Sequence, residues 1–326
     1  MNITRRDTLK FTAAALASSA LPQSVFAQAW PTRGIRAMVP FAAGSSLDII
    51  GRIVLDPLAT QLGQSIVVEN RGGAGGSIGT AQVAKSDPDG YTILIQASAH
   101  SAAPAAYPNI AYDPAKDFIA VIPFGTVPNV LVVAPGRDFK SATELAAAAR
   151  AKPGKFTYAS AGVGSATHWA AERYRMRGGF QAVHVPFRGG PEALTEVMTG
   201  RVDFTCMGIS AALPLIRDKK LVALAVSTPK RSSALPEVPT TLELGLKDSD
   251  YVYWMGMFLP AKTPAAIVEK LRAETAKALQ NPNVVEKFKG QGIEPMPLSP
   301  VEFDALIKRE IQANIELVKA AGLKFN

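Results

Sequence analysis

Two short stretches of small residues, each between a strand-like and a helix-like segment, carry most of the chemistry that this sequence offers. The first reads Phe-Ala-Ala-Gly-Ser-Ser-Leu-Asp at 41–48, and the second reads Gly-Val-Gly-Ser-Ala-Thr-His at 162–168. Such turns leave backbone N–H groups and hydroxyls at the positive end of a helix, which favours a bound anion. Both stretches therefore predict anion-binding turns, although ordinary strand-to-helix turns and N-caps also require glycine and serine.

Two further side chains are candidates for a binding site. Arg188 precedes two glycines in a third turn, where its planar guanidinium could pair with a carboxylate or remain a solvated surface charge. Trp254 lies in an apolar stretch, where it could pack at a hinge or form a pocket wall. Of the three histidines, His100 and His168 lie on turns and could hydrogen-bond a ligand, whereas His184 is expected in the core.

Other chemistries fit the sequence less well. Glycines 73, 75 and 79 follow a strand-like segment, but no acidic residue ends a strand about 20 residues further on, as a dinucleotide site requires. No GxSxG motif is present, so a hydrolase would depend on Ser165 and His168, three residues apart. No two histidines have the close spacing of metal ligands. We therefore predict no metal, no cofactor and no catalytic residue, with an exported serine hydrolase as the alternative.

The first 27 residues are predicted to be a secretory signal peptide. They combine a basic start, an apolar run from Phe11 to Leu21 and a small-residue exit ending at Ala27. The pair Arg5 and Arg6 favours twin-arginine export, with Sec export as the alternative. We therefore expect a periplasmic protein of 299 residues after cleavage near Ala27, and no later stretch reaches the 18 apolar residues of a membrane span.

Composition narrows the function further. The leader carries three basic residues and one acidic residue, so the formal charge falls from +8 to +6 on cleavage. Because the basic residues are scattered and not interleaved with aromatics, no nucleic-acid partner is expected. Cys206 is the single cysteine, which excludes an internal disulfide, and its apolar surroundings predict a buried position.

Strand-like and helix-like segments alternate along the chain, which is typical of an α/β fold with a doubly wound sheet. The predicted strands are 34–41, 65–70, 90–98, 129–136, 155–162, 182–187, 202–208 and 221–228. The predicted helices are 47–62, 77–86, 141–151, 168–176, 192–199, 211–217, 264–280 and 300–321. Pro57 should bend the first helix or end its first part. The alternation of strands and helices forms two successive series along the chain. These series imply two lobes with a cleft at the carboxyl ends of the strands.

Six stretches together resemble a known family. They are VPFAAGSSLD (39–48), VVENRGGAGGSIGT (67–80), IAYDPAKDFIAV (110–121), YASAGVGSATHWAAE (158–172), VPFRGGPEALTEVMTGRVDF (185–204) and WMGMFLPAKTP (254–264). In this order, and over essentially the whole mature chain, they resemble the solute-binding proteins of tripartite tricarboxylate transporters, the group named for Bordetella uptake genes. The first turn departs from the family pattern, because Leu47 stands where a threonine is common.

The resemblance implies a two-lobed type II periplasmic binding protein, or Venus flytrap, that holds a small carboxylate between the two turns. Lobe 1 would comprise 28–127 and 256–326 and lobe 2 would comprise 128–255, with crossings near 126–130 and 254–258. Asp48 would support its turn or meet a ligand amine. Joined with the candidates above, the predicted ligand-binding residues are Phe41, Ala43, Gly44, Ser45, Ser46, Asp48, Ser98, Gly162, Gly164, Ser165, Thr167, His168, Arg188 and Trp254.

The implied partners are a small carboxylate and the membrane permease subunits of such a transporter, with the protein itself a monomer. A sensing subunit for a membrane receptor is the alternative, because a sensor would use the same closed form. The ligand would stabilise that form by binding it more tightly than the open form.

Overall fold

The computed structural model describes residues 30–321, so the predicted signal peptide at 1–27 lies outside the described residues. The chain divides into a short unit, Met1–Thr32, and a large unit, Arg33–Asn326. All strands and helices described below lie in the large unit.

The first sheet has the strand order β2-β1-β3-β9-β4. Its strands are β1 (Ile35–Val39), β2 (Ile66–Asn70), β3 (Thr92–Ala97), β9 (Val252–Pro260) and the first part of β4 (Phe118–Val133). β1 is parallel to β2 and β3, whereas β9 is antiparallel to both β3 and β4. This sheet and its helices form the first lobe.

The second sheet has the order β8-β4-β7-β5-β6, with β8 and β7 on the two sides of β4. Its other strands are β5 (Phe156–Ser160), β6 (Ala182–Pro186), β7 (Phe204–Gly208) and β8 (Val222–Val226). β5 is parallel to β6 and β7, while β4 is antiparallel to both of its neighbours. This sheet and its helices form the second lobe.

Strand β4 belongs to both sheets. Its residues from Phe118 to Pro128 pair with β9, and its residues from Asn129 to Val133 pair with β7. The switch of partner lies within the first predicted crossing, 126–130. The return lies before the second predicted range, 254–258, because the Tyr251 N–H still bonds to the Ser227 carbonyl while Val252 already pairs with β4.

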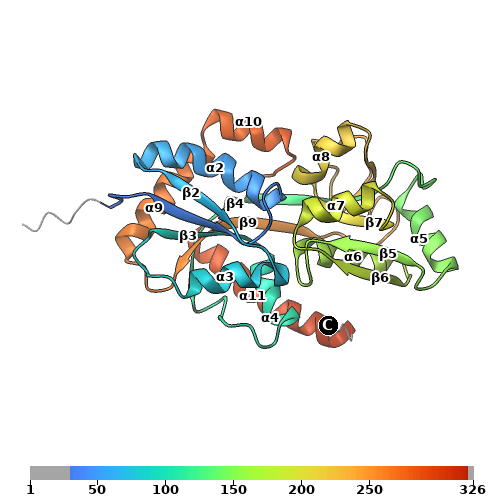
Figure 1. Cartoon of the computed structure of the whole chain (residues 1–326), viewed down its shortest axis with the longest axis horizontal. Coiled ribbons are helices and arrows are strands. Elements are labelled where there is room, and N and C mark those ends of the chain that lie inside the picture. Colours follow the sequence, from blue (N-terminus) through green and yellow to red (C-terminus); the bar gives the residue numbers. More distant parts are fainter. Residues whose placement is uncertain (1–29, 322–326) are drawn as a thin grey trace, which may run out of the picture. The chain divides into compact units, whose positions relative to one another are not determined.

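Helices cover both sheets (Figure 1). Those of the first lobe are α2 (Ser46–Leu62), α3 (Ser77–Ala84), α4 (Ala99–Ala106), α9 (Ala265–Leu279), α10 (Pro282–Gly290) and α11 (Pro300–Ala321), and a 3₁₀ turn, η2 (Ala74–Gly76), precedes α3. Those of the second lobe are α5 (Ala142–Ala151), α6 (Ala166–Arg177), α7 (Gly190–Met198) and α8 (Ile209–Arg217). Figure 1 shows α3, α4 and α11 on one side of the first sheet and α2 and α10 on the other.

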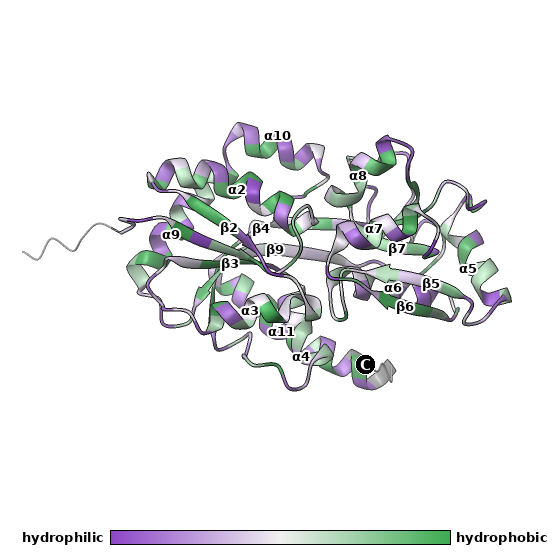
Figure 2. Cartoon of the chain, in the orientation of Figure 1, coloured by the Kyte–Doolittle hydropathy of each residue, from purple (hydrophilic) through white to green (hydrophobic). Residues whose placement is uncertain are grey.

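Local sequence signals explain where several helices begin and end. Ser141 caps α5, and its Oγ accepts from the Glu144 N–H at 3.2 Å. Gly63 ends α2 in the left-handed conformation at φ 66°. Of the two effects predicted for Pro57, an end to the first part of the helix is wrong, because α2 continues to Leu62 with Val54, Leu55 and Leu58 buried on either side of the proline. Figure 2 shows polar and apolar residues alternating along α5, α10 and α11, as expected for amphipathic helices.

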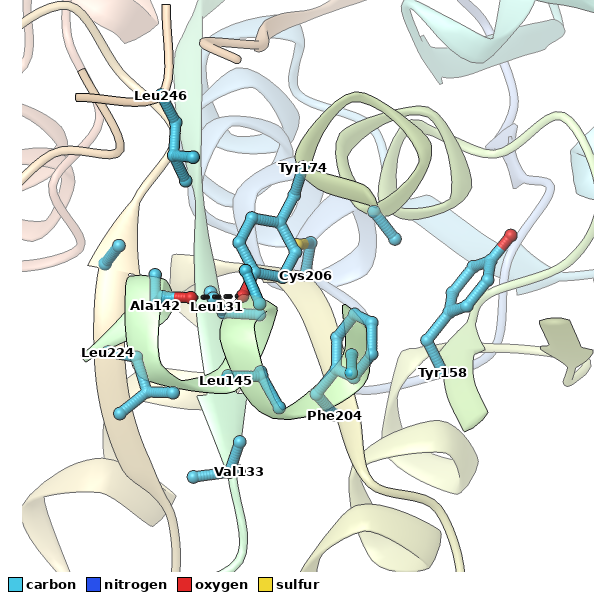
Figure 3. Close-up of a cluster of buried hydrophobic side chains, with 14 of the residues drawn as sticks. Leu131, Val133, Ala142, Leu145, Tyr158, Tyr174, Phe204, Cys206, Leu224 and Leu246 are labelled. Carbon is cyan, nitrogen blue, oxygen red and sulfur yellow. Dashed lines mark hydrogen bonds between the residues drawn. The ribbon is translucent and has the colours of Figure 1, made fainter. Parts of the chain in front are cut away.

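Each lobe has its own apolar core. In the second lobe, Tyr174, Phe204 and Leu145 pack around Cys206 (Figure 3), whose burial raises the pKa of its thiol. The Tyr174 hydroxyl donates to the Ala142 carbonyl at 2.6 Å, so its polar atom is paired inside the core. The predicted burial of Cys206 is confirmed.

Candidate functional site

The two small-residue turns have the same backbone geometry. Ser45 follows β1 and caps α2 with φ −67° and ψ 158°, and Ser165 follows β5 and caps α6 with φ −69° and ψ 160°. Each serine Oγ accepts from the backbone N–H three residues later at 3.3 Å, which is the N-cap hydrogen bond. The two strand-to-helix junctions are therefore copies of one local structure, one in each lobe.

The glycine before each serine extends this equivalence. Gly44 has φ 76° and Gly164 has φ 72°, a left-handed conformation in which a side chain is strained. The Gly44 N–H donates to Asp48 Oδ2 at 2.9 Å, and the Gly164 N–H donates to His168 Nδ1 at 3.1 Å. Each turn is thus closed by a side chain four residues after its glycine.

Both turns line one cavity of about 40 Å³, which also touches the starts of α7 and α8. Its lining residues are Phe41, Ser45, Ser46, Leu47, Ala97, Ala99, Ala161, Ser165, Ala166, Thr167, Gly190, Met207, Gly208, Tyr253 and Met255. Among the described residues, no charged side chain lines it. Polarity in this cavity therefore comes from hydroxyls and from the backbone.

Helix geometry supplies the main donors. The first N–H groups of a helix have no intrahelical carbonyl to bond. In α2 these include Ser46 and Leu47, in α6 they include Ala166 and Thr167, and all four residues line the cavity. Two helix N-termini therefore direct N–H groups and positive dipole ends toward the same small space, which suits one anionic group.

Hydroxyl protons add to these donors. Ser45 Oγ accepts the Asp48 N–H, which leaves its own proton to donate. Ser165 Oγ and Thr167 Oγ1 are 2.9 Å apart and each already accepts one backbone N–H. One of these two hydroxyl protons makes the bond between them, so the pair retains one proton for a ligand.

Ser46 has a different role from Ser45. Its Oγ donates to the Gly208 carbonyl at 3.0 Å and accepts the Ala211 N–H at 3.2 Å. Gly208 and Ala211 lie at the start of α8 in the second lobe, so a side chain of the first lobe caps a helix of the other lobe. Sequence reasoning placed Ser46 as a ligand donor, and the structure shows its hydroxyl engaged between the lobes.

Asp48 is engaged within its own turn. Its Oδ1 accepts from Arg52 Nε at 2.9 Å and from Asn70 Nδ2 at 3.0 Å, while Oδ2 accepts the Gly44 N–H. Of the two roles predicted for Asp48, support of the turn is the one that these contacts show. Asp48 is not among the residues that line the cavity.

His168 lies in a stack of rings beneath the second turn. Its ring is 4.0 Å from that of His184 with an interplanar angle of 8°, and the Tyr158 ring lies 4.8 Å from that of His184 and 6.2 Å from that of His168. Because Nδ1 accepts the Gly164 N–H, the neutral tautomer carries its proton on Nε2. Burial, and the neighbouring His184, lower the pKa of His168 to about 3, so the ring is neutral near pH 7.

A buried ion pair lies next to this stack. Glu172 accepts from the Tyr158 hydroxyl at 2.5 Å and pairs with Arg175 at 2.6 Å. Burial opposes ionisation of this carboxyl, but the hydrogen bonds from Arg175 and Tyr158 hold its pKa below the usual value. Burial likewise lowers the pKa of His184 to about 4, and its Nε2 lies 2.6 Å from Ser160 Oγ.

Three candidates lie away from the cavity lining. Trp254 is buried in the first core, 5.0 Å from the Phe303 ring, and its Nε1 donates to Glu310 at 2.9 Å. Ser98 is buried with its Oγ 3.2 Å from the Tyr251 hydroxyl. Arg188 is exposed and borders a separate hollow with Gly73 and Tyr107.

Some of the remaining predicted residues line the cavity and others do not. Phe41, Ser45, Ser46, Ser165 and Thr167 line the cavity. Gly44, Gly162, Gly164 and His168 shape the turns without lining it, and Ala43 is exposed. His100, an alternative ligand contact, is buried with its Nε2 3.0 Å from the Pro114 carbonyl.

Several lining residues were not predicted. Met207, Tyr253 and Met255 come from β7 and β9, and Gly190 and Gly208 from the starts of two further helices. Leu47, noted only as a departure from the family pattern, also faces the cavity. Glycines lie at the ends of two strands, Gly189 and Gly190 after β6 and Gly208 at the end of β7, and could have indicated these positions.

Comparison with known proteins identifies the family. The family described as "Tripartite tricarboxylate transporter family receptor" matches residues 50–323. The protein BugT of Bordetella pertussis is 35% identical over 329 residues, covering 99% of each chain. The chain therefore belongs to the tripartite tricarboxylate transporter receptor family, a family of periplasmic solute-binding proteins.

Two solved structures of similar fold have carboxylates in their descriptions. "R. palustris Rpa4515 with adipate" matches with a TM-score of 0.87 and 32% identity, over 90% of this chain and 99% of that one. "MatC (Rpa3494) from Rhodopseudomonas palustris with bound malate" matches with a TM-score of 0.84 and 32% identity, over 89% and 100%. The predicted two-lobed type II fold is confirmed. Within 30–321, no helix combines the length and apolar character needed to cross a bilayer.

Proposed function

We propose that this protein captures a small organic acid between its two lobes and delivers it to the permease subunits of a tripartite tricarboxylate transporter. The observation that carries the proposal is the convergence of four helix-start residues and the hydroxyls of Ser45, Ser165 and Thr167 on one cavity that no charged residue of the described chain lines. Backbone N–H groups and hydroxyls stabilise a carboxylate by charge-assisted hydrogen bonds. The related proteins described with adipate and with malate support the same ligand class.

Binding requires the lobes to separate and close again. Ligand pockets usually measure about 300–1,000 Å³, whereas this cavity measures about 40 Å³. The motion would bend the chain where β4 changes sheets between Pro128 and Asn129 and where the chain returns at Tyr251. We infer two lobes, 28–127 with 256–326 and 128–255, moving about these crossings without a chemical step.

We further propose that the protein is exported to the periplasm, where its signal peptide is removed near Ala27. There it acts as a monomer. A sensing role at a membrane receptor is the second candidate function, because the same closed form would serve it. The serine hydrolase alternative is less well supported. Ser165 Oγ acts as the cap of α6 and bonds to Thr167, while Nδ1 of His168 accepts the Gly164 N–H.

The test is calorimetric titration of the mature protein, unfolded and refolded to remove co-purified ligand. Mono- and dicarboxylates are compared with their amides, which have the same shape without the charge. We expect at least one acid to bind while its amide does not. A correctly refolded protein that binds no acid in the panel would contradict the proposed function.

A further inference from the structure

The glycine-rich loop between β2 and α3 lies directly against the second anion-binding turn. A Cβ built on Gly75 would lie 2.1 Å from the Val163 carbonyl oxygen, and one built on Gly162 would lie 3.1 Å from the Gly75 nitrogen. Two backbones from different lobes therefore touch at a point where no side chain fits. Gly75 and Val163 are almost ninety residues apart in the sequence.

A second pair of contacts flanks the first. A Cβ on Gly72 would lie 2.7 Å from the Arg188 carbonyl oxygen, and one on Gly189 would lie 2.5 Å from the Ala42 Cβ. The 188–189 turn of the second lobe thus fits against both the glycine-rich loop and the first anion-binding turn. Glycine at 72, 75 and 189 is required by contact between the lobes.

Two polar contacts fasten the same interface. The Tyr107 hydroxyl, at the end of α4, donates to the Val163 carbonyl at 2.9 Å. At the cavity lining, Ser46 Oγ donates to the Gly208 carbonyl and accepts the Ala211 N–H. Gly72, Gly75 and Tyr107 do not line the cavity, so the contacts of these three residues join the lobes outside the space that a ligand would occupy, whereas Ser46 and Gly208 also line that space.

We propose that Gly72 and Gly75 form the surface on which the second lobe closes, and that Tyr107 and Ser46 hold it closed. This inference rests on the proposed function, in which closure of the lobes encloses the bound acid. The stability of the closed form enters every measured affinity, since apparent affinity falls with the fraction of binding-competent protein. Gly72, Gly75 and Tyr107, which lie outside the cavity lining, then contribute to the affinity for any ligand.

Gly75→Ala is the decisive variant, with Gly63→Ala as its matched control. Gly63 has a similar positive φ, 66° against 60°, but a Cβ there would meet nothing within 4 Å. Both variants carry the same backbone strain, and only Gly75→Ala obstructs closure. We expect Gly75→Ala to weaken binding of every acid about tenfold or more, and Gly63→Ala to leave affinity within about twofold. Tyr107→Phe should weaken it by roughly threefold to tenfold, the net effect of one hydrogen bond.

Small-angle X-ray scattering of the same variants separates this inference from the proposed function. With or without an acid, Gly75→Ala should have a larger radius of gyration than Gly63→Ala. Equal affinities and equal radii for the two variants would overturn the inference. If the unmodified protein binds no acid, the proposed function fails, and the difference in radius alone then decides whether these glycines form the closing surface.

Discussion

Asp48 and His168 occupy equivalent positions in the two lobes. Each lies at the third helical residue after its capping serine, and each accepts a hydrogen bond from the glycine N–H four residues earlier, at 2.9 Å and 3.1 Å respectively. A carboxylate and a neutral imidazole thus perform the same structural task. The difference in charge leaves one turn dependent on the Arg52 partner of Asp48 and the other dependent on a buried neutral ring.

This equivalence predicts that His168 can be replaced by a residue that accepts but does not titrate. His168→Asn should keep the Gly164 N–H paired, because the short side chain of Asp48 already makes this bond in the first turn. His168→Phe should leave that buried N–H without an acceptor and lower the free energy of unfolding by about 1–3 kcal/mol. Urea unfolding of the two variants provides the measurement. Equal losses for Asn and Phe would show that the acceptor is unimportant.

The histidine stack predicts loss of stability in acid. The pKa values of His168 and His184 in the folded protein, about 3 and about 4, lie below the usual value of 6.5. The unfolded chain therefore binds more protons over this interval, so the free energy of unfolding decreases as pH falls from about 6.5 toward 4. Denaturation at a series of pH values measures this slope. His168→Asn should make it shallower, and an unchanged slope would contradict the assignment.

The hydroxyl donors predict an effect on binding that is separate from an effect on stability. Ser45→Ala and Ser165→Ala each remove an N-cap and should cost about 0.5–2 kcal/mol of stability. Ser141→Ala removes the equivalent cap of α5, outside the cavity lining, and should cost a similar amount. Titration with a bound acid should show weaker affinity for the first two variants and an unchanged affinity for Ser141→Ala. Equal affinities for all three would exclude the hydroxyls as ligand contacts.

We expect the buried Glu310, in the core of the first lobe, to tolerate replacement by glutamine. It accepts from Trp254 Nε1 at 2.9 Å and from Ser101 Oγ at 2.6 Å, and burial raises the pKa of this carboxyl above its usual value. Ionisation near pH 7 therefore costs stability that Glu310→Gln avoids while keeping an acceptor oxygen. We expect Gln to leave the midpoint of thermal unfolding equal or higher. Glu310→Ala should lower it, because the Trp254 N–H then has no acceptor. A lower midpoint for Gln than for Ala would contradict this.

Much of the fold follows from local patterns in the sequence. Strands β1, β3, β7 and β8 are short apolar segments bounded by turn residues, and α5 has a capping box around Ser141 and Glu144. The stretch at 252–260 was interpreted only as a hinge or pocket wall, because a strand buried on both faces shows no alternation. Helix α4 was missed because Pro104 and five alanines give no amphipathic pattern. Helix α10 was also not predicted, although Asn281 as the N-cap and Pro282 at the first helical position indicate where it begins.

The two turns of the candidate site could be predicted from the sequence, but the cavity-lining residues of β7 and β9 could not. The repeated pattern Gly-Ser-x-x followed by Asp48 or His168 already suggests that the two turns are equivalent. What the sequence does not contain is which strands face the cavity, since Met207 and Tyr253 reach it through pairings between distant segments. For the same reason the contact partner of Gly75 could not be predicted. A glycine can indicate that another backbone approaches closely, but it does not identify which segment does so.

The position of β9 between β3 and β4 has a consequence for synthesis of the chain. The first sheet remains open at this place until residue 260 has left the ribosome, although β1, β2 and β3 are complete by residue 97. The second sheet needs nothing beyond Val226. The lobe that begins first is thus finished last. Until then it presents two unpaired strand edges, the feature of a nascent chain that is most exposed to association with other chains.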